Sequence, residues 1–322
     1  MELNNKYVSL KRRIENSQWI LLCIVIVIIS VITASINPKF FRMHNIMNIF
    51  EQISVLGLVS VGATIIIISG NFDISVGALI GLTSCVMAIG INNGINPIFA
   101  SLIGIALSIC CTTFNGILSI IFKAPSFIIS LATTSIYTGI ALFITKGVIR
   151  TVYGQFDALS VTKVFGFIPL LFIISLIGYI LVHIMLSYTQ IGRRLFALGA
   201  NERAAYLAGI DIIKNKLLFF AMNGFFVGIA SMLLLSRVGA ALPSTGKGYE
   251  LQAMGAVVIG GVSINGGKGN VIGSFFGVLL MGLISNALNI LGVNPYLQEI
   301  ASGTIIILSL GVSAFRTKNK TN

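Results

Sequence analysis

The chain has 322 residues and a formal net charge of +12; 56% of its residues are hydrophobic and 9% are charged. A soluble domain carries roughly 25% charged residues, so this composition excludes a water-soluble fold and predicts an integral membrane protein. The apolar runs reach the length of about 20 residues that a membrane helix needs, and they lack the alternation of a membrane barrel. The basic residues lie between these runs rather than in one patch, which argues against nucleic-acid binding.

In chain order, four basic residues precede a first apolar run from Trp19 to about Ile36. A signal peptide begins in the same way, but this run is longer than a typical h-region, so we expect an uncleaved first span. The later apolar runs predict nine more spans, at about 53–69, 77–92, 96–122, 127–145, 167–187, 217–236, 251–264, 271–291 and 299–315. We therefore predict an all-α integral membrane protein with about ten transmembrane helices in a single domain, residues 1–322.

Ten spans place both termini on one side of the membrane, and that side carries twice as many Lys and Arg residues as the other. The positive-inside rule therefore predicts that both termini and the polar interval 188–216 are cytoplasmic. Within this interval, residues 201–205 followed by Gly209 predict a short amphipathic helix that ends at the glycine. Such a helix suits docking to another protein, although the interval would also serve as a plain connection between two spans.

Four acidic residues, Glu51, Asp73, Glu250 and Glu299, fall at predicted helix starts, where a carboxylate complements the helix dipole. Ionisable groups at membrane depth are costly and indicate function by default. For Asp73 and Glu250 we favour helix capping over contact with a substrate, and we expect Glu51 and Glu299 at the membrane interface. No carboxylate lies in mid-span with a partner, which argues against a proton relay.

Polar and small residues inside the predicted spans indicate how the helices pack. Three amides are expected to bridge helices rather than to line a path for a sugar: Asn115, Asn286 and Asn289. Glycines four residues apart allow close approach of helices, as in Gly77–Gly81 and Gly273–Gly277. Residues 114–127 also align with 284–297 at an offset of 170, which suggests an internal repeat of the kind found in transporters.

The sequence offers no catalytic or metal-ligating set. Its four cysteines lie inside apolar runs and its two histidines are isolated, so neither a metal site nor a catalytic group is expected. The segment Gly267-Lys268-Gly269 lacks the spacing of a nucleotide-binding loop. If ATP drives this protein, a partner polypeptide must bind the ATP, and this chain needs no cofactor of its own.

Several segments resemble the permease subunits of ribose-type ABC sugar importers, the group that also serves galactosides, xylose and autoinducer-2. The similar segments keep their order over nearly the whole chain: 37–41 (NPKFF), 70–77 (GNFDISVG), 192–209, 246–251 (GKGYEL), 258–261 (VIGG), 266–269 (GGKG) and 289–293 (NILGV). Two departures stand out, since Asn71-Phe72 replaces a common Gly-Ile and Leu242 precedes Pro243 where Gln is common. The resemblance therefore does not identify ribose as the substrate.

The resemblance implies a bacterial cytoplasmic-membrane permease that forms a path for a monosaccharide or similar polar solute, together with a second copy or a paralogue. Two ATPase domains carrying ATP and Mg²⁺ would dock on residues 188–216, and an extracytoplasmic binding protein would deliver the solute. The implied ATPase-coupling residues are Gly192, Arg193, Arg194, Asn201, Glu202, Arg203, Ala204, Ala205 and Gly209. Candidates for the path or a helix break are Asn71, Phe72, Asp73, Ser75, Tyr249, Glu250, Asn115, Asn286 and Asn289.

Two other functions stay open on the sequence alone. A secondary carrier driven by an ion gradient is consistent with the repeat and the broken helices. A membrane-embedded enzyme would need a positioned nucleophile and base or a metal cluster, and the sequence supplies neither.

Overall fold

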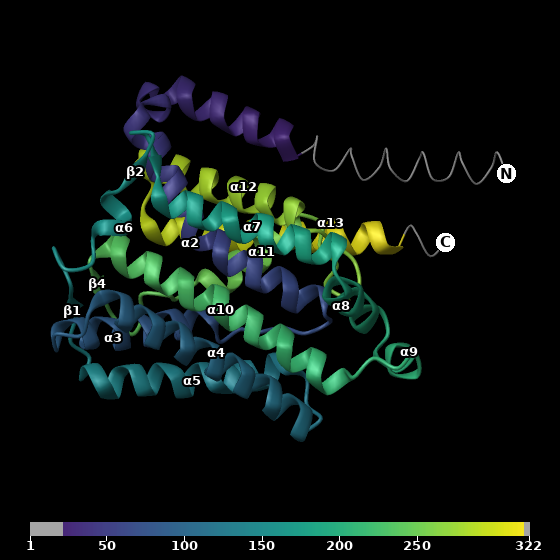
Figure 1. The fold of residues 1–322 in the computed structure, drawn as a ribbon. Coiled ribbons are helices and arrows are strands. Elements are labelled where there is room, and N and C mark those ends of the chain that lie inside the picture. The colour runs from purple at the N-terminus through teal and green to yellow at the C-terminus, as the bar shows by residue number, and fades with distance from the viewer. Residues whose placement is uncertain (1–21, 319–322) are drawn as a thin grey trace.

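The computed structural model describes residues 22–318 of the chain, which fold into a bundle of helices (Figure 1). An apolar helix over Leu22–Ile36 comes first. It is followed by η1 (Pro38–Phe41), α2 (Met43–Ile68), α3 (Val76–Asn92), α4 (Pro97–Ile121), α5 (Ser126–Thr145), α6 (Ala158–Val161), α7 (Leu170–Tyr188), α8 (Gln190–Ala200), α9 (Glu202–Leu207), α10 (Ile212–Val238), α11 (Tyr249–Ile259), α12 (Val271–Ile290) and α13 (Pro295–Lys318). Short antiparallel pairs join β1 (Arg150–Thr151) to β4 (Ala240–Ala241) and β2 (Lys163–Val164) to β3 (Ile168–Pro169).

Six of the described helices are long and apolar enough to cross a membrane: α2, α4, α5, α7, α10 and α12. The helix α11 is not, because its 11 residues rise only about 16 Å, roughly half of a hydrocarbon core of about 30 Å. The apolar run over 251–264 is therefore helical only in its first part, and residues 260–264 at the end of the predicted span lie outside the helix. The helix stops early because Gly261 adopts a φ of +93°, a left-handed conformation that suits glycine.

The helix α2 begins at Met43, well before the predicted start near residue 53. Its first turns carry polar side chains, which a search for apolar runs leaves out, but tertiary contacts hold them in the helix. Asn45 and Asn286 of α12 exchange two amide hydrogen bonds of 2.9 Å each. Glu51 consequently lies inside α2 and not at a helix start, and its carboxylate pairs with Nε of Arg237 at 3.6 Å.

The order of the helices repeats along the chain. A long helix, a break, a shorter helix and two further helices form the series α2, α3, α4 and α5, and the same order recurs in α10, α11, α12 and α13 about 170 residues later. The two series run in opposite directions, since α2 ends beside α8 whereas α10 starts there and ends at β4 (Figure 1). This agrees with the internal repeat expected from the sequence and makes it an inverted one.

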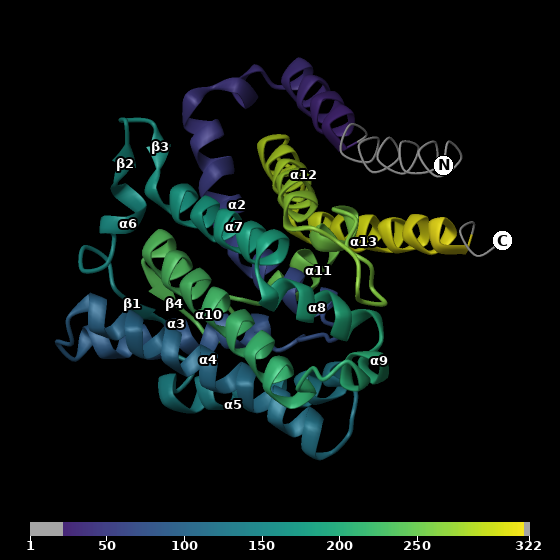
Figure 2. The same ribbon diagram turned by 45° about the vertical axis from the view of Figure 1, so that its right-hand side comes forward.

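Each long helix of the repeat packs with the other series. The helix α2 packs against α11 and α12, whereas α10 packs against α3 and α4. Figure 2 shows α3, α4 and α5 grouped near α10, with α11, α12 and α13 on the side of α2. In the most apolar stretch of α2, 89% of the residues are buried, against 22% for α5, so α2 is the central helix and α5 an outer one.

The connections gather at two ends of the bundle. At one end, β1 pairs with β4, and the side chain of Asn37 donates to the carbonyl of Ile290. At the other end, the backbone amide of Gly267 donates to the carbonyl of Ile68, beside α8. We name these the β1–β4 end and the α8 end. A series of membrane spans in sequence also requires that the loops between them lie alternately at two opposite ends of the bundle.

Candidate functional site

The backbone leaves helical geometry directly after α2. Gly70 takes a φ of +79°, residues 71–74 are not helical, and α3 begins at Val76. The amides of Phe72 and Ile74 would have no partner within such a stretch, and they donate instead to the hydroxyls of Ser126 and Ser130 in α5, at 2.9 and 3.0 Å. The outer helix α5 therefore stabilises the non-helical backbone of the break by accepting these hydrogen bonds.

The carboxylate of Asp73 lies at the centre of this break and is only 6% exposed. Its Oδ1 accepts from the amide and the hydroxyl of Ser75, at 3.0 and 2.6 Å. Its Oδ2 accepts from Nδ2 of Asn223 in α10 at 3.0 Å. Because Ser75 and not Asp73 directly precedes α3, and no side chain caps that helix, the predicted capping role of Asp73 is wrong. The carboxylate instead joins the break to other helices.

Asn115 and Tyr137 extend the network to α4 and α5. Nδ2 of Asn115 donates to the hydroxyl of Ser75 at 2.9 Å and lies 3.4 Å from Oδ1 of Asp73. The hydroxyl of Tyr137 lies 2.9 Å from Oδ1 of Asn115. The cavity beside Asp73 and Asn223 measures about 10 Å³, the space of a single water molecule. The side chains of the network fill the space at the break, so a sugar does not fit there in this conformation.

A second break precedes α11. The segment 242–248 runs against the first two turns of α3, where the backbone of Gly246 and Pro243 occupies the space that side chains at Gly77 and Gly81 would need. Gly248 has a φ of +94°, and its amide donates to both carboxylate oxygens of Glu250, at 3.2 and 3.0 Å. Glu250 thus lies in the first turn of α11, where a carboxylate complements the helix dipole, and it holds the residue that precedes the helix. The first turns of the two short helices meet inside the bundle.

The structure brings most of the predicted path residues to these two breaks. Asn71, Phe72, Asp73, Ser75 and Asn115 surround the first break, and Tyr249 and Glu250 open the helix after the second. The predicted close packing is confirmed as well, because the backbone carbonyls of Gly260 and Ala256 fill the space beside Gly273 and Gly277.

Two of the predicted residues lie elsewhere. Asn286 pairs with Asn45, and Asn289 accepts from Gln298 at 3.0 Å, both at the β1–β4 end. Both amides make structural contacts, as expected of amides that bridge helices. Asn223, Ser126 and Ser130 were not singled out from the sequence. Asn223 and Ser130 are polar residues within apolar spans, the same signal that identified Asn115, whereas Ser126 directly precedes a predicted span.

The polar interval 188–216 forms two helices at the α8 end. Asn201 ends α8 and caps α9, since its Oδ1 accepts from the amide of Ala204 at 2.9 Å. Gly209, at a φ of +80°, ends the second helix, which confirms the predicted short helix and its glycine stop. The amide of Lys214 donates to the Asp211 carboxylate and lowers the pKa of that carboxyl below its usual value.

The residues implicated in coupling divide by exposure. Arg193, Arg194, Glu202, Arg203 and Ala204 are exposed on α8 and α9. Gly192 and Ala205 are buried; the backbone of Met185 and Leu186 leaves no room for a side chain at Gly192. Tyr206 and Leu207, which the sequence did not single out, are 69% and 78% exposed. The outer surface of α9 is therefore apolar as well as charged.

Three backbone segments meet where α8 ends. The Cα of Gly199 lies against the carbonyl of Ile68, the last residue of α2. The amide of Gly267, in the turn between α11 and α12, donates to the same carbonyl at 2.8 Å. A Cβ on Gly266 would stand 2.7 Å from the carbonyl oxygen of Gly199 and 2.9 Å from the Cα of Gly70. We name this contact of 68–70, 199–200 and 266–267 the glycine joint.

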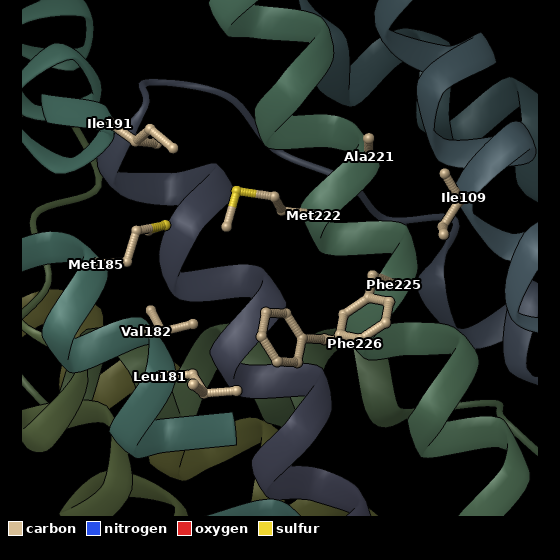
Figure 3. Close-up of a pocket in the computed structure, with 9 residues that line it drawn as sticks. All are labelled: Ile109, Leu181, Val182, Met185, Ile191, Ala221, Met222, Phe225 and Phe226. Carbon is tan, nitrogen blue, oxygen red and sulfur yellow. The ribbon is translucent and has the colours of Figure 1, made fainter. Parts of the chain in front are cut away.

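A larger crevice lies between α4, α7, α8 and α10 (Figure 3). It measures about 420 Å³ and is lined by Ile109, Leu181, Val182, Met185, Ile191, Ala221, Met222, Phe225 and Phe226. These side chains offer no hydrogen-bonding group beyond the thioethers of two methionines, so the crevice cannot recognise a hydroxylated solute. Among the described residues, no group of three His, Cys, Asp or Glu side chains is placed to bind a metal.

Comparison with known families and proteins gives a consistent result. The family described as "Branched-chain amino acid transport system / permease component" matches residues 45–310. The ribose import permease protein RbsC of Bacillus subtilis (strain 168) is 34% identical over 287 residues, 88% of each chain. RbsC of Haemophilus influenzae is 37% identical over 305 residues, 92% of each chain. The D-allose transport system permease protein AlsC of Escherichia coli (strain K12) is 34% identical over 299 residues, 91% of each chain. No solved structure matches this chain.

Proposed function

Because this chain belongs to the family of permease components of ABC sugar importers, we propose that separate ATPase subunits drive it by docking on α8 and α9. The chain is a multi-pass protein of the cytoplasmic membrane and the permease subunit of a monosaccharide importer. Its relatives are named for ribose, D-allose and L-arabinose, so we propose a pentose or hexose as the solute. The ATP and Mg²⁺ belong to the partner.

The surface of α9 carries this proposal. Tyr206 and Leu207 are large apolar side chains that project at the end of the bundle, beside the exposed charges of Glu202 and Arg203. An exposed apolar patch rimmed by polar residues is typical of a protein interface. The cap at Asn201 and the left-handed Gly209 give this helix a fixed start and end, so that it presents a rigid surface to a partner.

We propose ten membrane passages with both termini cytoplasmic. The gathering of the loops at two ends supports this count, with α3 and α11 as short passages completed by the extended segments before them. A second permease subunit, either a copy or a paralogue, would complete the path, and two ATPase domains and an extracytoplasmic binding protein would complete the importer. The residues at the two breaks, Asn71, Phe72, Asp73, Ser75, Asn115, Tyr249 and Glu250, belong to the moving part of the path.

The docking surface is tested by replacing Leu207 with Asp. We expect the ATPase subunit to be lost from the purified complex and ATP-driven uptake to fall at least tenfold, while the amount of permease in the membrane is unchanged. The control is Val161→Asp on α6, a side chain that is 68% exposed at the β1–β4 end. Uptake that survives Leu207→Asp, or that collapses with an ion gradient while ATP is kept constant, would refute ATPase docking on α9.

A further inference from the structure

Lys247 is exposed, although it lies between the two ends of the bundle and not at either of them. Its neighbour Gly246 packs on Gly77, and from Gly77 the helix α3 rises about 22 Å to its end at Asn92. In the other direction, α11 runs about 15 Å from Tyr249 to Ile259, beyond which the chain reaches the α8 end. A hydrocarbon core of about 30 Å therefore contains Lys247 near its middle.

A side chain of this kind cannot face lipid. An ammonium group is costly at the centre of a bilayer, and the described residues place no carboxylate within ion-pair distance of Lys247. Ser244 is exposed in the same turn, and Glu250 is half-buried one turn further along. The backbone of 242–248 is irregular, and irregular backbone at this depth is stable only where it is buried in protein or lines a water-filled cavity.

We propose that Ser244, Lys247 and Glu250 form a wall of the water-filled path and hydrogen-bond the sugar as it passes, an inference that rests on the proposed import function. The three side chains supply an ammonium donor, a carboxylate acceptor and a hydroxyl that does both, which matches the mixed donors and acceptors of a sugar's hydroxyl groups. The wall adjoins α3 through Gly77 and Gly81, so a movement of the first break changes the width of the path directly.

Cysteine labelling in the intact importer tests this wall. Ser244→Cys changes one atom of an exposed side chain, so it preserves the fold. The reagent is a charged, water-soluble methanethiosulfonate, and peptide mapping locates the modified thiol. The native Cys110 is the matched control, because it is exposed on α4, a helix with little buried surface that we expect to face lipid. We expect the thiol introduced by Ser244→Cys to react at least tenfold faster than Cys110, and substrate delivered by the binding protein to slow that reaction.

Uptake measurements complete the test. Lys247→Met should reduce the rate of uptake at least fivefold without changing ATP hydrolysis, whereas Lys163→Met, an exposed lysine at the β1–β4 end, should leave both unchanged. A thiol in the Ser244→Cys variant that reacts no faster than Cys110 in every nucleotide state overturns the path wall. If wild-type uptake does not require ATP, the proposed import mechanism fails, and fast labelling of the Ser244→Cys variant would still show a water-filled path.

Discussion

Gly199 of α8 lies with its Cα against the carbonyl oxygen of Ile68, the last helical residue before the break that holds Asp73. The contact is between backbones, so neither partner can move aside as a flexible side chain would. If an ATPase docks on α8 as proposed, a displacement of α8 would therefore reach the end of α2 directly. Through the amide of Gly267, it would also reach the turn between α11 and α12.

Gly199→Ala tests this transmission. A Cβ would overlap the Ile68 carbonyl and stand 2.7 Å from the Gly267 amide nitrogen, so α8 must shift away from the joint, at a cost of about 1–3 kcal/mol. We expect the ATPase to remain bound and to hydrolyse ATP, while the ratio of solute imported to ATP hydrolysed falls at least tenfold. Gly139→Ala on α5, where a Cβ meets nothing within 4 Å, is the control. An unchanged ratio of solute imported to ATP hydrolysed in Gly199→Ala would contradict transmission through the glycine joint.

The hydrogen bond from Asn223 to Asp73 predicts unequal effects of two substitutions. Asn223→Leu leaves a buried carboxylate oxygen without its donor, which costs about 1–3 kcal/mol or more for a charged group. Asp73→Asn should be milder, because Asn223 can rotate its amide and present Oδ1, an atom that has no partner within the described chain. The measurement is the midpoint of thermal unfolding in detergent, with the exposed Asn92→Leu as control. Equal shifts of the unfolding midpoint in Asn223→Leu and Asn92→Leu would contradict a stabilising role of the hydrogen bond between Asn223 and Asp73.

The ion pair of Glu51 and Arg237 should stabilise the crossing of α2 and α10 at the β1–β4 end. Its side chains are 19% and 27% exposed, between the surface and buried cases, so we expect a coupling of about 1–2 kcal/mol. A double-mutant cycle with Glu51→Gln and Arg237→Gln, followed by denaturant unfolding in detergent, gives this value. The pair Lys214–Asp211, 86% and 47% exposed, is the matched comparison and should couple by less than about 0.5 kcal/mol. Equal coupling energies in both cycles would show that the pair of Glu51 and Arg237 does not stabilise the crossing of α2 and α10.

Features that depend on local chemistry were predictable from the sequence. The apolar runs predicted most of the long helices, residues 201–205 with the Gly209 stop predicted α9, and the glycine pairs predicted close crossings. These features follow from residues near one another in the chain, so no knowledge of the tertiary structure is needed.

Features that depend on partners far along the chain were not predictable. The carboxylate of Asp73 finds a donor 150 residues away, and Glu51 pairs with Arg237 across two helices. The first turn of α2 is polar, and its Asn45 is paired with Asn286 of α12, 241 residues away. In each case the sequence shows one polar group but not the one that satisfies it, and the choice between capping and bridging depends on that partner.

The long helix of each series packs against helices of the other series, and this arrangement has a consequence for membrane insertion during translation. When the ribosome has completed α5, the central helix α2 is already in the membrane, but α11 and α12, against which it packs, have not yet been made. The polar groups of Asn45 and Glu51 lack their partners during that interval. The first half of this protein therefore has to be stabilised by the insertion machinery, or by lipid and water, from the end of α5 at Thr145 until α12 is complete at Ile290.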